Sequence, residues 1–305
     1  GRAGSDMPFS PPVQHPLRGI ALFMLALMLF ALLDATSKHL TATFAVPLLV
    51  WARYALHFVI MLVFVAPSMR SRLIRTDNLS LQIVRALALV GTTGFAMMAF
   101  RSMPLAEATA VLFLAPLLVT LLAGPFLHEH IGAGRWAAAI VGFAGVLLIA
   151  RPGGALNLAG IFWALAGAAC YAVYQILTRR LSHAEHPLTL LFYTALVGTG
   201  VMSAALPWFW THASPEPLQW LLIASLGMYG GVGHFLLIRA FRLAPASTLT
   251  PFTYVQLVWA ALLGWLVFGH VPDLLSAAGM AVIAAAGLWL ALGERRSATQ
   301  ARAVG

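Results

Sequence analysis

The fold is decided by one stretch that occurs twice, as LAEATAVLFLAPLLVTLLAGPFLHEH at residues 105–130 and as LAPASTLTPFTYVQLVWAALLGWLVFGH at residues 243–270. At an offset of 138 residues, Leu105-Ala106-Glu107-Ala108 falls on Leu243-Ala244-Pro245-Ala246. Nearer the N-terminus, Gly19-Ile20 falls on Gly160-Ile161 at an offset of 141 residues. The chain therefore contains two copies of one unit.

The composition predicts that both copies lie in a lipid bilayer. Hydrophobic residues make up 61% of the chain and charged residues 9%, with a mean hydropathy of +0.89. Soluble domains are usually about one quarter charged. Apolar stretches of about 20 residues span the hydrocarbon core. We expect ten spans, at residues 17–37, 47–65, 80–100, 105–126, 134–150, 157–178, 188–206, 218–238, 246–268 and 274–292.

The distribution of Lys and Arg predicts the orientation of these spans. With the N-terminus in the cytoplasm, thirteen basic residues fall on inside segments and three on outside ends, namely Lys38, Arg101 and Arg151. Cytoplasmic loops carry such an excess of positive charge. We therefore expect cytoplasmic termini and a bacterial inner (cytoplasmic) membrane location. Nucleic acid is not an expected partner, because basic residues on alternating loops form no continuous face.

Five spans precede the turn-rich linker Arg151-Pro152-Gly153-Gly154 and five follow it, so the two repeats should be inverted. We assign residues 17–150 and 157–292 to the repeats, 151–156 to the linker, and 1–16 and 293–305 to tails. Residues 1–6 are expected to be an expression remnant. The predicted fold is an all-α integral membrane protein of ten transmembrane helices, in two inverted five-helix repeats around a central cavity.

The fourth and fifth spans of the first copy combine small residues, an internal proline, a following acid and paired glycines. These are Ala106, Ala108, Ala110, Pro116, Glu129, Gly142 and Gly145. Two such copies beside ten spans resemble the drug/metabolite transporter superfamily, in its ten-helix form of two EamA domains. The resemblance covers residues 17–292, but His270 stands where the second copy usually has glutamate. The YVQLVW segment at residues 254–259 is most similar to YddG-type aromatic amino-acid exporters.

The resemblance implies a substrate pathway between the halves, and polar stripes on several spans independently indicate one, since polar faces avoid lipid. We predict a substrate-binding set of Met97, Trp163, Tyr171, Tyr174, Gln175, Tyr229, His234 and Tyr254. Each has a structural alternative. Trp163 and Tyr171 could serve as interfacial or packing aromatics, Tyr174 and Gln175 as an inner gate, and His234 as a satisfied buried histidine.

A second set is predicted to gate the pathway or to line its vestibule: Asp34, Lys38, Arg53, His57, Pro116 and Pro251. Asp34 and Lys38 are one helical turn apart and can pair, as can Arg53 and His57. A structural ion pair near the headgroups is equally compatible with Asp34 and Lys38. The two prolines fall in the fourth span of each half, where paired interruptions are typical of moving helices that form a site.

We expect a secondary transporter that exports small organic metabolites, most plausibly aromatic or other apolar amino acids, by alternating access. No acidic residue is expected at mid-span, which favours a facilitative carrier. A multidrug or metabolite proton antiporter that uses His234 is the alternative. An intramembrane lipid-modifying enzyme is less favoured, because the sequence lacks its acid, nucleophile and metal motifs. We predict no catalytic residue, cofactor or metal, and a monomer or homodimer in the lipid bilayer.

The charge count makes a testable prediction about topology. A cysteine introduced by Gly153→Cys should react with a membrane-impermeant reagent from the outside, and cysteines at Ser5, His183 and Thr299 only from the cytoplasm. Cysteine labelling in intact cells and in inverted vesicles measures this. Labelling of Gly153→Cys from the cytoplasmic side alone would overturn the inverted arrangement.

Overall fold

The structure is a computed structural model that describes residues 16–127, 132–151, 157–182, 184–210, 214–244 and 249–304. Every regular element in these ranges is helical. The first repeat contains α1 (Pro16–Thr41), α2 (Val46–Ile60), η1 (Met61–Val65), α3 (Ala66–Met69), η2 (Arg70–Leu73), α4 (Leu79–Ser102), α5 (Leu105–Leu112), α6 (Ala115–Leu127) and α7 (Ala133–Ala150). The second contains α8 (Leu158–Ser182), α9 (Pro187–Phe209), α10 (Pro217–Leu243), η3 (Thr250–Tyr254), α12 (Val255–Phe268) and α13 (Leu274–Val304).

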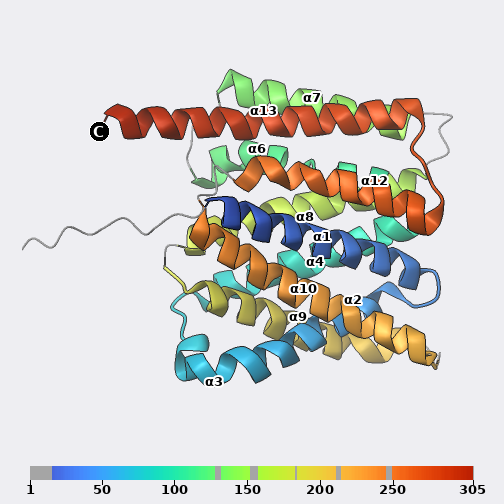
Figure 1. Ribbon diagram of the computed structural model, residues 1–305. Helices are drawn as coiled ribbons and strands as arrows, with labels where there is room; N and C mark the ends of the chain where they lie inside the picture. Colours follow the sequence, from blue (N-terminus) through green and yellow to red (C-terminus); the bar gives the residue numbers. More distant parts are fainter. Residues whose placement is uncertain are drawn as a thin grey trace, which may run out of the picture.

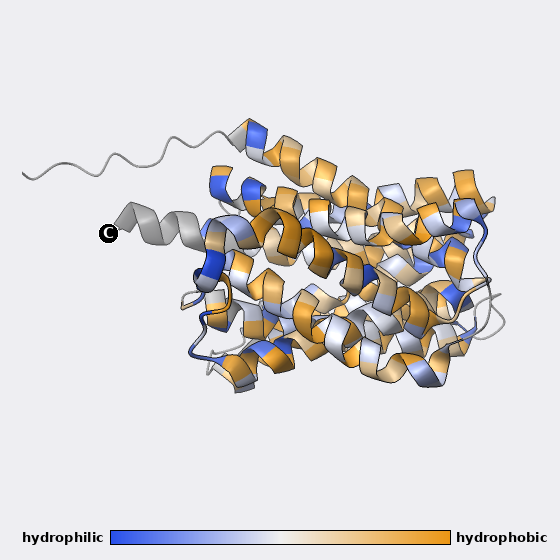
Figure 2. Cartoon of the chain, turned by 90° about the horizontal axis from the view of Figure 1, so that it is seen from below, coloured by the Kyte–Doolittle hydropathy of each residue, from blue (hydrophilic) through white to orange (hydrophobic). Residues whose placement is uncertain are grey.

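The helices run along one common axis, as a bilayer requires (Figure 1). Within the described residues, nine helical segments are long and apolar enough to cross a membrane, and Phe252–Phe268 is a tenth, shorter one. Large apolar side chains cover the outer surface, for example Phe64, Leu147 and Trp208, which are between 71% and 80% exposed. Hydrophobic residues dominate the helices in Figure 2, and hydrophilic ones gather near the two ends. The predicted all-α membrane fold is confirmed.

The bundle has two ends, which we call the Thr41 face and the Arg72 face. Helix α1 ends at the Thr41 face, where α2 begins, and the η2 segment with Arg72 lies at the Arg72 face (Figure 1). Helix α1 starts at the Arg72 face, whereas its counterpart α8 starts at the Thr41 face. The two repeats are therefore inverted relative to each other.

Packing between the repeats follows this inverted symmetry. Helix α1 packs on α10, and α8 packs on α4, which is the equivalent pair with the repeats exchanged. Helix α2 packs on its own counterpart α9, and α7 on its counterpart α13. These two self-equivalent pairs mark the pseudo-twofold axis. The central cavity that the sequence suggested stays a prediction.

The fourth and ninth spans are broken, whereas the sequence suggested continuous helices over 105–126 and 246–268. Helix α5 stops at Leu112, and α6 restarts at Ala115 with Pro116 in its first turn. In the second repeat, Pro251 lies in the 3₁₀ segment η3 before α12. Proline lacks the amide hydrogen that continues a helix, so both breaks have a local cause. The interruptions occupy corresponding places in the two repeats.

Two glycines bring α7 and α13 into backbone contact. A Cβ atom on Gly279 would lie 2.6 Å from the carbonyl oxygen of Gly145, and one on Gly145 would lie 2.8 Å from that of Gly279. Only hydrogen fits at either position. Small residues at such crossings are the common means of close helix packing in membranes.

We predict that Gly279→Ala lowers the free energy of unfolding by about 1–3 kcal/mol, because the added methyl group forces the two backbones apart. Thermal unfolding of the purified protein in detergent measures the change. Gly200→Ala is the matched control, since a Cβ atom there meets nothing within 4 Å. Equal unfolding midpoints for the two variants would contradict the proposed backbone contact.

Candidate functional site

Polar side chains from both repeats meet inside the bundle. Gln256, in the first turn of α12, donates from Nε2 to Asp34 Oδ2 of α1 over 3.2 Å. Arg53 of α2 donates from Nη1 to the Thr93 hydroxyl of α4 over 3.2 Å, and the Tyr54 hydroxyl lies 2.8 Å from the same oxygen. Because lipid offers no hydrogen bonds, buried polar groups must be satisfied by the protein.

Asp34 and Arg53 carry opposite charges at the same depth. Each lies seven residues from the helix end at the Thr41 face, which corresponds to about 10 Å along the axis. They are close enough for electrostatic attraction. Nevertheless, no ion pair joins them within the part of the chain that the structure describes, and each is bound to a neutral partner. A bound molecule with two opposite charges could engage both.

Two histidines lie deeper, between α2 and α10. The rings of His57 and His234 are parallel, with centroids 6.4 Å apart and an interplanar angle of 6°, and Phe30 lies 5.0 Å from the His234 ring. The Phe30 ring approaches so closely because Gly233 has no side chain there. The expected interaction of Arg53 with His57 is replaced by Arg53 with Thr93 and His57 with His234. Among the described residues, no group of three or more His, Cys, Asp or Glu side chains could hold a metal ion.

The predicted stripe on α8 divides into two aromatic pairs. Trp163 stacks on Phe95 of α4, with centroids 5.6 Å apart, and its other neighbour is Phe162. Tyr171 stacks on Tyr174 at 5.7 Å. Gln175 is half-buried on the same helix. These side chains present flat surfaces toward α4, where the two repeats meet.

Tyr174 also belongs to a buried arginine network that sequence reasoning missed. Arg85 of α4 is 2% exposed and donates to four oxygens, those of Thr178, Thr194, Tyr174 and the Leu190 carbonyl, at 2.7–3.0 Å. Its guanidinium lies 4.7 Å above the Tyr174 ring. The network joins α4 to α8 and α9, across the repeats. Its one sequence signal is a charged residue within an apolar span.

The remaining predicted residues pack in the core. Met97 is 1% exposed, and Tyr229 packs on the same cluster. Tyr254 is 7% exposed, contacts the Phe113 ring, and rests against the bare backbone of Gly287. These contacts place Met97 and Tyr254 in helix packing, away from the polar cluster of Asp34 and Arg53.

A second charged group crosses the repeats at the Thr41 face. Lys38 does not pair with Asp34; its Nζ donates to the carbonyls of Phe100 and Met103 at 2.6 and 2.9 Å, at the end of α4. Glu107 of α5 is 1% exposed and lies 3.0 Å from His270 Nε2, just beyond α12. Its second oxygen is buried without a partner.

The burial of Glu107 corrects the expectation that every acid lies in a loop, in a tail or near a span end in contact with water. Glu107 is the third residue of α5, but α5 starts inside the bundle, with almost all of its residues buried. A near-terminal position in a span is therefore no guide to exposure here.

The exposed Asp273 fixes the start of α13 at the same face. The Ser276 backbone N–H and the Arg151 guanidinium hold the pKa of this carboxyl below its usual range. The Arg151–Asp273 ion pair links the end of α7 to α13.

Comparison with known proteins identifies this architecture. The EamA-like transporter family matches residues 17–151 and again 158–293, which together make up most of the chain. The chain belongs to the EamA-like transporter family. It is therefore a secondary transporter of the drug/metabolite superfamily that moves a small molecule across a membrane, and not an enzyme.

Curated relatives in this family carry two different substrate names. A riboflavin transporter of Vibrio cholerae is 28% identical over 85% of this chain and 87% of its own length. An S-adenosylmethionine uptake transporter of Rickettsia prowazekii is 27% identical over 92% of this chain and 95% of its own length. The family is thus shown, while these names differ from the amino acids suggested by the sequence.

A solved crystal structure supports the fold of this EamA transporter. It superposes with a TM-score of 0.65 at 22% identity, and covers 91% of this chain and 98% of its own. At this identity the likeness concerns the fold alone.

Proposed function

We propose that the protein carries a metabolite with an α-amino-acid group and an apolar or aromatic part across the bacterial cytoplasmic membrane. The observation that carries this proposal is the pair of unjoined opposite charges, Asp34 and Arg53, at one depth between the repeats. An α-amino-acid group presents one ammonium and one carboxylate, which match these two side chains. Charge-assisted hydrogen bonds of this kind are about twice as strong as neutral ones.

The aromatic pairs of α8 supply surfaces for the rest of the substrate. Trp163 with Phe95, and Tyr171 with Tyr174, offer flat faces. Aromatic contacts contribute about 0.5–1.5 kcal/mol beyond buried area. Gln175, Tyr229 and His234 remain proposed hydrogen-bonding residues of this site. S-adenosylmethionine, named for several relatives, has both an α-amino-acid group and a heteroaromatic ring.

A flat heteroaromatic molecule without an amino-acid group, such as riboflavin, is the second candidate substrate. The aromatic pairs favour it, as does the name of the Vibrio cholerae relative. The two candidates differ in their need for Asp34 and Arg53, because riboflavin offers no ammonium and no carboxylate.

The orientation rests on the basic residues of the Arg72 face, which we place in the cytoplasm together with both termini. A carrier without obligatory coupling moves its substrate down its gradient. Export of amino acids and uptake by relatives are then two directions of the same cycle. We propose this facilitative mode for a monomer or homodimer.

We predict that Asp34→Asn and Arg53→Gln each reduce uptake of tryptophan and S-adenosylmethionine into proteoliposomes at least tenfold, since each removes a charged hydrogen bond of about 1.5–3 kcal/mol. Asp273→Asn and Arg101→Gln are matched controls with the same charge changes at exposed positions. Radiolabelled flux is the measurement. Normal flux of both solutes in Asp34→Asn and Arg53→Gln, together with transport of riboflavin, would replace the amino-acid proposal by the second candidate.

Alternating access requires contacts between the repeats that break when one face opens. At the Thr41 face, Glu107 of the first repeat meets His270 of the second, and Lys38 lies 5.4 Å from the Phe268 ring of α12. We propose that these contacts form the closed gate of this face. The breaks before Pro116 and Pro251 let α6 and α12 move relative to the segments that precede them.

Glu107→Gln tests this gate, because it keeps the shape of the side chain but removes its charge. We predict about tenfold faster labelling of an Ala108→Cys reporter, which is fully buried when the face is closed. The measurement is the rate of reaction with a membrane-impermeant maleimide in a background with Cys170 replaced. Asp273→Asn, at the same face, is the control. An unchanged rate in Glu107→Gln would remove this ion pair from the gate.

A further inference from the structure

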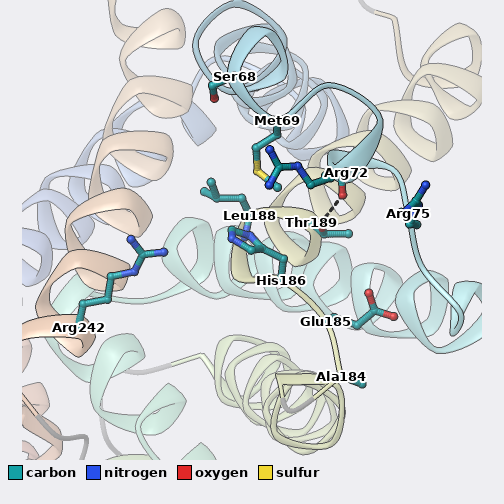
Figure 3. A pocket seen from close by; sticks show the side chains of 10 residues that line it. All are labelled: Ser68, Met69, Arg72, Arg75, Ala184, Glu185, His186, Leu188, Thr189 and Arg242. Atoms are coloured by element: carbon teal, nitrogen blue, oxygen red, sulfur yellow. Dashed lines mark hydrogen bonds between the residues drawn. The ribbon is translucent and has the colours of Figure 1, made fainter. Parts of the chain in front are cut away.

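The Arg72 face contains a cavity of about 530 Å³ that the transport pathway does not use. Its walls come from α3, η2, the start of α9 and the end of α10, so it joins the first repeat to the second. Figure 3 shows Arg72 and His186 near its centre, and Arg242 on α10 across from them. The cavity lies at the depth of lipid headgroups, where the spans end.

The lining is strongly positive and its arginines are unpaired. Arg72, Arg75 and Arg242 all line the cavity, and none of their guanidinium groups has a hydrogen bond or ion pair in the described ranges of the chain. Glu185 is the one carboxylate in the lining, and it is occupied elsewhere: its Oε1 accepts from Thr76 at 2.6 Å and from Asn78 at 3.3 Å. Positive charge therefore remains available.

Helix α9 adds to this potential at the same place. It begins at Pro187 with its N-terminal end beside the cavity, and His186 caps it by accepting from the Leu188 backbone N–H at 3.2 Å. The N-terminal end of a helix carries a partial positive charge that favours anions. The arginines and this helix end act on one small volume.

The η2 segment is held rigidly against α9, which positions Arg72. The Thr189 hydroxyl donates to the Arg72 carbonyl over 3.3 Å, and the Tyr193 hydroxyl donates to the Ile74 carbonyl over 2.7 Å. Arg70 adopts a positive φ of 50°, unusual for a residue other than glycine. These contacts fix the backbone of η2 while the Arg72 side chain stays directed into the cavity.

We propose that this cavity binds a phosphate group, held between Arg72 of the first repeat and Arg242 of the second. Guanidinium groups match phosphate oxygens in shape and charge. Thr189 and Ser68 supply hydroxyl groups in the same lining. Such a ligand would bridge the two repeats at this face.

A phospholipid headgroup is one source of this phosphate, and a soluble phosphate ester is the other. The lipid source is favoured by the surface next to the cavity. Val59, Leu62, Val63 and Phe64, on α2 and η1, are 44–75% exposed and lead directly into α3 at the cavity wall. Acyl chains can lie along this stripe while the headgroup reaches the arginines.

Binding of phosphatidylglycerol, phosphatidylcholine, glycerol 3-phosphate and inorganic phosphate to the purified full-length protein distinguishes these sources. Native mass spectrometry counts the retained lipids, and thermal unfolding reports the soluble anions. We expect phosphatidylglycerol to bind at least tenfold more tightly than phosphatidylcholine. Arg72→Gln and Arg242→Gln should each weaken this binding about fivefold. Arg101→Gln, at the opposite face, should leave it unchanged.

Stabilisation by glycerol 3-phosphate or inorganic phosphate that depends on Arg72 and Arg242, without a lipid preference, supports the site with a soluble source. Equal binding of both lipids and no effect of either anion overturns the proposal. So does phosphatidylglycerol binding that is equal in Arg72→Gln, Arg242→Gln and Arg101→Gln. Unfolding midpoints without ligand establish that the variants are folded, and loss of transport would not produce any of these results.

Discussion

A hydrogen bond that lipid cannot supply is the constraint on which the structure depends. Arg85 illustrates it, because a charged residue inside an apolar span is tolerated only when protein atoms replace water. Its four acceptors come from α8 and α9, so satisfying one side chain fixes three helices across the repeat interface. Asp34 and Arg53 obey the same constraint more loosely, each with a neutral partner on another helix. The packing core and the proposed site differ mainly in how completely their polar groups are satisfied.

Duplication supplies the scaffold, and departures from symmetry supply its directional chemistry. The helix pairs α1–α10 and α8–α4 are equivalent, and both broken spans contain a proline at the interruption. Glu107, however, corresponds to Pro245 in the second copy, so an acid at one face has no acidic counterpart at the other. Unpaired arginines similarly gather at the Arg72 face. One backbone plan therefore presents different charges to the two sides of the membrane.

The sequence was a good guide to whatever depends on local pattern. Span positions followed from hydropathy, the inverted arrangement from span number, and the breaks lie at Pro116 and Pro251, where proline chemistry is local. Interactions between distant residues were not accessible in this way. Lys38 has partners more than 60 residues away instead of Asp34 one turn away, and Glu107 meets His270 at a separation of 163 residues. Charge at a helix end does not reveal whether another helix covers it.

The glycine contact of α7 and α13 has a consequence for the ancestry of the chain. Gly145 and Gly279 lie on the pseudo-twofold axis, where each repeat contributes one half of the same contact. In an ancestor built from two identical five-helix chains, a single glycine codon would have served both halves. After gene fusion the two codons became independent, but neither could drift without damaging the contact that both maintain. Off-axis positions such as Glu107 carried no such mutual restraint and were free to specialise.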